Sequence, residues 1–163
     1  MCQIDGDHWI FILALRSPDS AEAAQFYGAL PLTVDTTPPE APWNVHARAA
    51  SEQVELSWER DDTTKHTWLL VDRNAKASSD AMPLPCSSSR LPPAVLFDPA
   101  DPNARAALPE GIVMREFLGP ITKTTFEGSE LGTSVSAAVV IAADAAFNVS
   151  AASKPVCLPA WSE

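Results

Sequence analysis

Apolar and polar residues alternate most regularly in the stretch between Val54 and Trp58. Val54, Leu56 and Trp58 lie on one side of this alternation, and polar residues lie between them. Strict alternation is typical of a strand with one buried face. A shorter strand-like run precedes it at 43–49, and the polar segment 50–53 separates the two runs. The pattern therefore predicts two consecutive strands joined by a turn.

The segment in front of these strands is rich in proline and predicts a boundary. Pro38, Pro39 and Pro42 fix φ and push the residues before them out of the helical region. Upstream, residues 8–35 contain two apolar strand-like runs with a turn-like composition between them, so they are predicted to form a hairpin. A hairpin alone is marginally stable in water. This one must therefore pack on the following domain or on another molecule.

Further apolar segments downstream predict an all-β chain. The expected strands are residues 67–73, 111–118, 121–126, 134–144 and 149–158, with a turn at 128–133. In the first of these strands, Trp68 and Leu70 face one way, and Leu69 and Val71 face the other. A proline-rich insertion, 74–110, follows it. Long loops of this kind are usually functional or mobile.

Composition narrows the class of partner. The 163 residues carry a formal charge of −10, so nucleic acid is not expected, because its binding needs Lys and Arg to neutralise phosphates. Fifteen prolines against six glycines favour strands joined by stiff loops over helices. The apolar run at 9–15 is too short to span a membrane and follows Asp5 and Asp7 rather than basic residues. It therefore resembles neither a membrane span nor a signal peptide.

Two separated motifs resemble the fibronectin type III family. The first is Thr36–Trp58, in which a proline-marked entry leads to a strand reading Val-x-Leu-x-Trp. The second is Val139–Ser150, which is similar to strand F, the FG turn and the start of strand G in bacterial members of the family. Two features depart from the family: Phe147 stands where glycine is usual, and the only tyrosine, Tyr27, lies outside the domain.

The resemblance implies an immunoglobulin-like β-sandwich of fibronectin type III type. Residues 37–158 would form this domain, interrupted by the insertion 74–110 and followed by a tail at 159–163. Residues 1–36 would form an N-terminal β-hairpin that resembles the last two strands of a preceding immunoglobulin-like domain. The expected core includes Val54, Leu56, Trp58, Trp68, Leu70 and Val140.

The three cysteines leave two alternatives open. Cys86 in the insertion and Cys157 near the end of the closing strand resemble the cysteines of such domains in myxobacterial surface proteins. The resemblance implies a Cys86–Cys157 disulfide, which would close a loop of about seventy residues and stabilise the fold by roughly 3–4 kcal/mol in the chain-entropy model. Cys2 would then be left over. In the other alternative all three cysteines are reduced.

Candidate chemical sites are few. Asp98, Asp101 and Asn103 form the best cluster of oxygen ligands for calcium, and Asp35 is a second candidate. The favoured interpretation of Asp98–Asn103 is turn chemistry, because the EF-hand spacing is missing.

Other motifs point away from catalysis. His8, His46 and His66 lack the spacing of metal ligands, and no nucleophile motif or phosphate loop occurs. The sequon Asn148-Val149-Ser150 is attributed to the turn motif itself. No cofactor and no enzymatic activity are expected.

The expected function is that of a non-catalytic spacer and protein-interaction module, extracellular, periplasmic or on the outer-membrane surface. Its partners would be proteins of the cell envelope, contacted through the insertion 74–109, with no direct membrane span. One alternative is a structural subunit that self-associates when the hairpin 8–35 adds its strands to a neighbour. Another is a carbohydrate-binding accessory module, which would use exposed tryptophans.

Overall fold

The computed structural model describes residues 5–14, 25–50, 52–77, 86–87, 91, 108–131 and 135–158. The chain divides into two compact units, Met1–Thr37 and Pro38–Glu163. No helix in these described ranges is long and apolar enough to cross a membrane.

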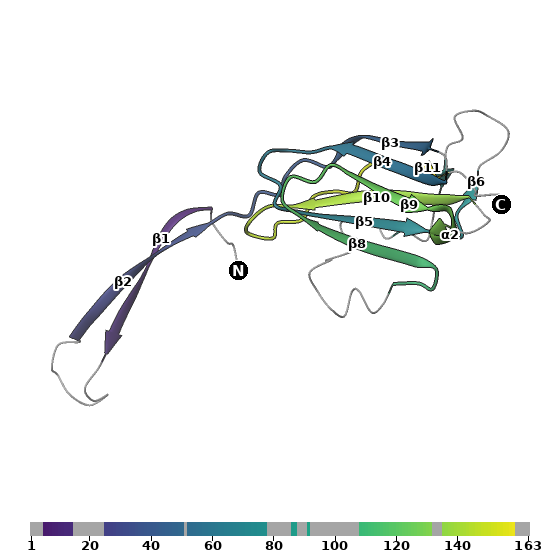
Figure 1. Ribbon diagram of the computed structural model, residues 1–163. Helices are drawn as coiled ribbons and strands as arrows, with labels where there is room; N and C mark the ends of the chain where they lie inside the picture. Colours follow the sequence, from purple (N-terminus) through teal and green to yellow (C-terminus); the bar gives the residue numbers. More distant parts are fainter. Residues whose placement is uncertain are drawn as a thin grey trace. The chain divides into compact units, whose positions relative to one another are not determined.

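The first unit is an antiparallel hairpin of β1 (Gly6–Ala14) and β2 (Gln25–Val34), drawn in purple and dark blue in Figure 1. Cross-strand pairs such as Ile10 with Leu30 set its register. Apolar side chains are exposed on both faces, since neighbouring residues of a strand point to opposite sides. The most exposed are Trp9, Ile10, Phe11, Leu30 and Leu32, at 44–63%.

Hydrogen bonds close the open end of this hairpin. The Asp5 carboxylate accepts from the Thr36 backbone N–H at 2.8 Å, from the Thr36 hydroxyl, and from the Thr37 hydroxyl at 3.3 Å. The Thr36 hydroxyl is the main cause that lowers the pKa of Asp5. The Thr33 hydroxyl donates to Asp7 at 2.8 Å. These bonds join the start of β1 to the end of β2 but leave the apolar faces of the hairpin exposed to solvent.

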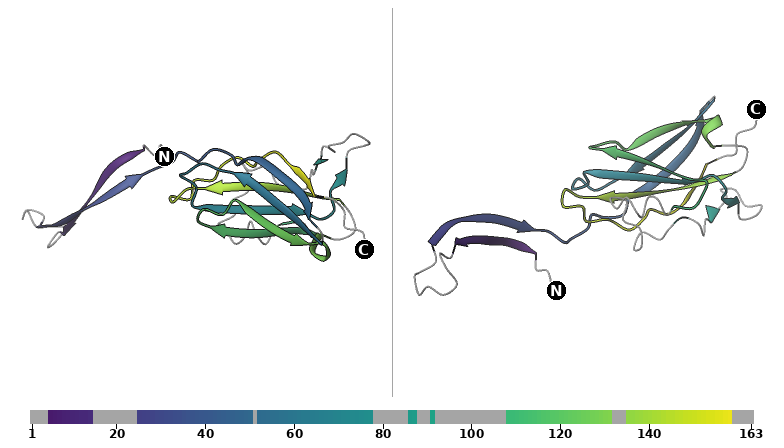
Figure 2. Two further views of the ribbon diagram at one scale, coloured as in Figure 1. Left: turned by 45° about the horizontal axis from the view of Figure 1, so that its top comes forward. Right: turned by 90° about the horizontal axis from the view of Figure 1, so that it is seen from below.

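The second unit contains two antiparallel sheets that face each other (Figures 1 and 2). One has the order β3 (Trp43–Ala50), β4 (Gln53–Glu59), β9 (Lys123–Glu127). The other has the order β11 (Val156–Leu158), β10 (Ser136–Ala143), β5 (His66–Asp72), β8 (Ile112–Leu118). Two short strands, β6 (Lys76–Ala77) and β7 (Cys86–Ser87), pair within the predicted insertion. The predicted turn at 128–133 includes a four-residue helix, α2 (Gly128–Leu131).

A hydrophobic core fills the space between the two sheets. The three-stranded sheet contributes Val54, Leu56, Trp58 and Phe126, and the four-stranded sheet contributes Leu69, Val71, Ala138, Val140 and Leu158. Burial of this kind is the main stabilising contribution to folding. The expectation of an all-β fold with a β-sandwich is confirmed at this level.

A second core lies on the other face of the four-stranded sheet. Trp68, Leu70, Val139 and Ile141 are buried there. Leu91 and the partly buried Leu108 and Ala75, all from the predicted insertion or its edges, pack against them. Every residue of β10 is buried. The four-stranded sheet is therefore covered on both faces, whereas an ordinary antiparallel sandwich leaves the outer face to water.

The closing strand is shorter than predicted. The sequence pattern predicts a strand over 149–158, but only Val156–Leu158 form β11. Before it, the buried hydroxyls of Ser150 and Ser153 accept hydrogen bonds from the backbone N–H groups of Ala142 and Val140 at 3.0 and 2.9 Å. Serine side chains thus take the place of backbone carbonyls in the ladder, so the prediction was wrong about this segment.

Arg115 bridges the two sheets on the side where β8 and β9 form the edges. Its guanidinium lies 4.1 Å from the centre of the Phe126 ring, donates to the Thr125 carbonyl at 3.0 Å and to the Glu130 carboxylate. The Glu127 backbone N–H is the main cause that lowers the pKa of Glu130, and Arg115 adds to it. Charged and cation–π contacts therefore link the edge strands of the two sheets on this side.

Candidate functional site

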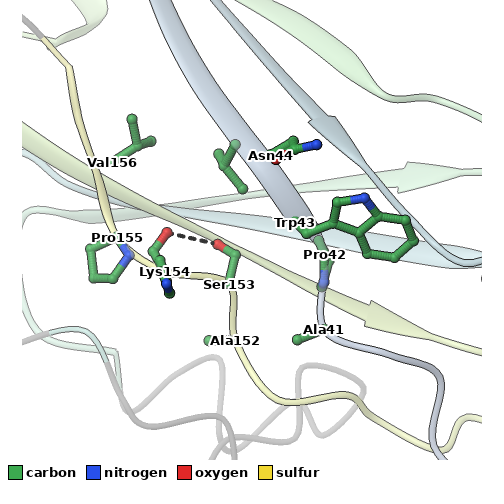
Figure 3. Close-up of a pocket in the computed structure, with 10 residues that line it drawn as sticks. Ala41, Pro42, Trp43, Asn44, Ala152, Ser153, Lys154, Pro155 and Val156 are labelled. Atoms are coloured by element: carbon green, nitrogen blue, oxygen red, sulfur yellow. Dashed lines mark hydrogen bonds between the residues drawn. The ribbon is translucent and has the colours of Figure 1, made fainter.

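The opposite side of the sandwich is hollowed into a groove. Its walls are residues 41–45, at the entrance to β3, and residues 152–156, which lead into β11. The cavity measures about 580 Å³. Figure 3 shows Trp43 and Pro42 on one wall and Lys154 and Pro155 on the other. Pockets of this size can accommodate a small ligand or several side chains of a partner.

The two serines explain why the groove exists. Because Ser150 and Ser153 bond to β10 through their side chains, the segment before β11 follows β10 and adds no regular strand. On the facing wall the β3–β4 register shifts between Trp43 and His46. Asn44, inside this irregularity, has a φ of 47°, a left-handed conformation that asparagine tolerates. Both walls are therefore extended chain without regular pairing to each other.

Glu59 holds two side chains at the rim of the groove. Its carboxylate accepts from Trp43 Nε1 at 2.6 Å and from Asn44 Nδ2 at 3.1 Å. The bond from Asn44, followed by that from Trp43 and the charge of His46, lowers the pKa of Glu59. Trp43 is 38% exposed. Glu59 thus fixes the orientation of an exposed aromatic ring.

Acid is expected to release Trp43. A carboxylate with a lowered pKa in the folded state keeps its hydrogen bonds above its ordinary pKa of 4.5 and loses them as the pH falls through the lower folded value. The indole N–H resonance of Trp43 should therefore shift in an NMR titration with a midpoint below pH 4.5. Glu59→Gln should abolish this titration, and a midpoint at or above 4.5 in the unsubstituted chain would contradict it.

A second cluster surrounds His66 at the start of β5. Its ring stacks on Trp68 with centroids 5.7 Å apart and meets Phe147 at 4.4 Å. His66 Nδ1 lies 3.8 Å from Glu116 Oε1. Phe147 is 50% exposed and has a φ of 62°. It occupies the turn position where the family resemblance leads one to expect glycine, and its ring covers the histidine.

Asp144 organises this turn. Its carboxylate accepts from the backbone N–H groups of Ala146 and Asn148 at 2.8 and 3.0 Å and from Asn148 Nδ2 at 2.9 Å. The amide of the sequon asparagine is therefore engaged inside the fold. This arrangement supports the interpretation of Asn148–Ser150 as turn chemistry.

Replacing Phe147 separates backbone strain from ring packing. A left-handed backbone costs a non-glycine residue about 1–2 kcal/mol, so Phe147→Gly should relieve strain while losing the contact with His66. Phe147→Ala should lose the same contact and keep the strain. We expect the alanine variant to be less stable than the glycine variant by about 1 kcal/mol in urea unfolding. Equal stability of the two variants would show that the left-handed conformation is not strained.

The remaining predicted site residues are placed as follows. Asp98, Asp101 and Asn103 lie outside the described residues. Asp35 is exposed, and its carboxylate accepts from the Thr37 N–H at 3.0 Å. Within the described ranges no group of three His, Cys, Asp or Glu side chains could hold a metal ion. His8, His46 and His66 lie on the three different strands β1, β3 and β5.

Cys157 lies on the outer face of the four-stranded sheet and is disulfide-bonded. The side chain of Cys86 lies outside the described residues, so the pairing of these two cysteines stays a prediction. The groove itself was not predicted. Its only signal in the sequence is a tryptophan, Trp43, directly after a proline-rich entry.

Comparisons with known proteins do not assign this chain to a family. No protein-family profile and no curated protein matches the chain. Twenty-seven chains among solved structures match it. One of them, titled "Myokine structure", aligns at 14% identity with a TM-score of 0.42 over 75% of this chain and 97% of that chain. A likeness at this level carries no argument about fold or function.

Proposed function

We propose that this protein is a non-catalytic β-sandwich module that acts as a spacer and protein-interaction domain of the cell envelope. The observation that carries the proposal is the exposed apolar hairpin. Trp9 and Leu30 are 59% and 54% exposed on a two-stranded ribbon. Exposed apolar patches usually mark interaction sites.

The sandwich unit is proposed to be of fibronectin type III type. The sheet order supports this assignment: β3, β4 and β9 correspond to strands A, B and E, while β8, β5, β10 and β11 correspond to C′, C, F and G. Aligned antiparallel sheets with such connections are typical of this class of sandwich.

An extracellular or periplasmic location is part of the same proposal, because disulfides persist in oxidising compartments. Cys157 faces the outer core, where Leu91 and Ala75 from the insertion also pack. A partner at Cys86 would fasten the insertion to the sheet that it covers. Peptide mapping without reduction should recover a Cys86–Cys157 linked peptide. Recovery of both as free thiols from the natural host would contradict the location.

A second candidate function is supported by the two faces of the hairpin. Because both faces are apolar, a flat partner surface would cover only one of them. Incorporation of the ribbon into a partner's sandwich would cover both. The alternative is therefore a structural subunit that assembles by strand addition from its hairpin.

Photo-crosslinking in the producing cells tests both candidates. A photoreactive amino acid at Trp9 should give adducts, whereas the same group at Leu118, which is 64% exposed on β8, should not. Adducts with an envelope protein support the interaction module, and adducts with a second copy support the structural subunit. If position 9 gives no adduct above the level of position 118, both candidates are wrong.

A further inference from the structure

The groove contains a strand edge that can accept another strand. β3 is the outer strand of its sheet and pairs with β4 on one side, and no strand in the described part of the chain pairs with its other side. Unpaired N–H and C=O groups along such an edge are a template for strand addition. β3 has eight residues and contains no proline. Its register with β4 shifts between Trp43 and His46 and is regular from His46 to Ala50, so the regular part is the template for a new ladder.

The hairpin offers a strand that can be added. β1 has nine residues, also without proline, and is close in length to β3. β2 contains Pro31, opposite Trp9. Proline inside a sheet usually turns its missing N–H toward the solvent edge. The outer edge of β2 is therefore interrupted, and the outer edge of β1 is the one suited to pairing.

Side chains on β1 suit the groove. Asp7 and Trp9 point to the same face because residues two apart in a strand do so. The groove is lined largely by small or apolar side chains (Ala41, Pro42, Val45, Ala152, Pro155 and Val156), and Lys154 is exposed on its wall. An indole inserted into this cavity would bury its apolar surface, while a carboxylate two residues away could approach the lysine ammonium.

We propose that the outer edge of β1 from one copy of the chain pairs with β3 of a second copy, with Trp9 in the groove between residues 41–45 and 152–156. The inference rests on the structural-subunit form of the proposed function and names the acceptor site. Donor and acceptor are different surfaces, so each bound copy still presents an open groove or an open hairpin. Such heterologous contacts generate open chains unless the rotation closes a ring.

The charge of the protein gives this assembly a specific salt dependence. Each copy carries −10, so long-range repulsion opposes association. Added sodium sulfate screens that repulsion and, as a kosmotropic salt, strengthens apolar burial. Sedimentation velocity of the full chain should therefore show species larger than the monomer that increase with both protein concentration and salt.

Two single variants and their mixture test the proposal. Trp9→Ser removes the inserted side chain, and Pro155→Trp, at an exposed wall position, fills the groove. Each should weaken self-association about tenfold or more, as for a central interface residue. Each variant keeps one intact surface, so an equimolar mixture should form a one-to-one complex that does not extend further. Leu118→Ser, which removes an exposed leucine from β8, should leave association unchanged.

The outcomes separate the site from the function. If Trp9→Ser prevents assembly while Pro155→Trp and Lys154→Glu, both folded by circular dichroism, assemble normally, the structural subunit stands and the groove is not its acceptor. A chain that stays monomeric at every concentration and salt overturns both. Saturable binding of a glycan that is lost in Trp43→Ala, without self-association, would assign the groove to sugars and also overturn the proposal.

Discussion

Replacing Trp68 with alanine is expected to lower the free energy of unfolding by about 3–5 kcal/mol. Trp68 has no exposed surface, although its strand position directs it away from the space between the two sheets. The loss should be that of a core residue, because Leu91, Leu108 and their neighbours cover it. Urea unfolding followed by circular dichroism measures the change.

Leu118→Ala is the matched control on the same sheet. Leu118 lies on β8 with 64% of its surface exposed, so its truncation should change stability by no more than about 0.5 kcal/mol. If Trp68→Ala behaves like this control, the outer face of the sheet is open to water in solution and the second core does not form there.

Ser153→Ala is expected to cost about 1–3 kcal/mol, and Ser150→Ala about as much, because each leaves a buried backbone N–H of β10 without its acceptor. Truncation of a surface serine should have no such consequence. Ser129→Ala, at an exposed position of α2, should stay within about 0.5 kcal/mol of the parent chain.

Hydrogen exchange distinguishes this mechanism from a general loss of packing. Ser153→Ala should accelerate exchange at the Val140 amide, and Ser150→Ala at the Ala142 amide. Uniform acceleration along the whole of β10 in both variants would show that the serines act through packing instead.

Local pattern predicts the strands of this protein well because each strand buries side chains in a regular order. The alternation Val54, Leu56, Trp58 corresponds to β4, where all three residues belong to the inner core. The division of β5 into two faces is also correct, since Leu69 and Val71 lie in the inner core and Trp68 and Leu70 in the outer one.

Contacts between distant segments set the limits of that prediction. A strand that is apolar on both faces does not reveal which segment will cover its second face, so the packing of Leu91 and Leu108 could not be foreseen. The strand ladder ends near Ser153 because its hydroxyl accepts a hydrogen bond from the backbone N–H of Val140, thirteen residues away. The groove depends on that same hydrogen bond and on the position of β3 at the edge of its sheet. Only the sheet order shows this position.

The doubly covered sheet limits how copies of this unit can be joined. In a chain of consecutive sandwich domains, an exposed sheet face is a surface on which a neighbouring domain or a ligand can pack. Here Val139, Ile141 and Trp68 are already buried on that face by other side chains of the same chain, among them Leu91 and Leu108. The four-stranded sheet is therefore expected to contact other molecules through strand edges and turns. Main-chain pairing, and not packing on a sheet face, would then determine which molecules bind it.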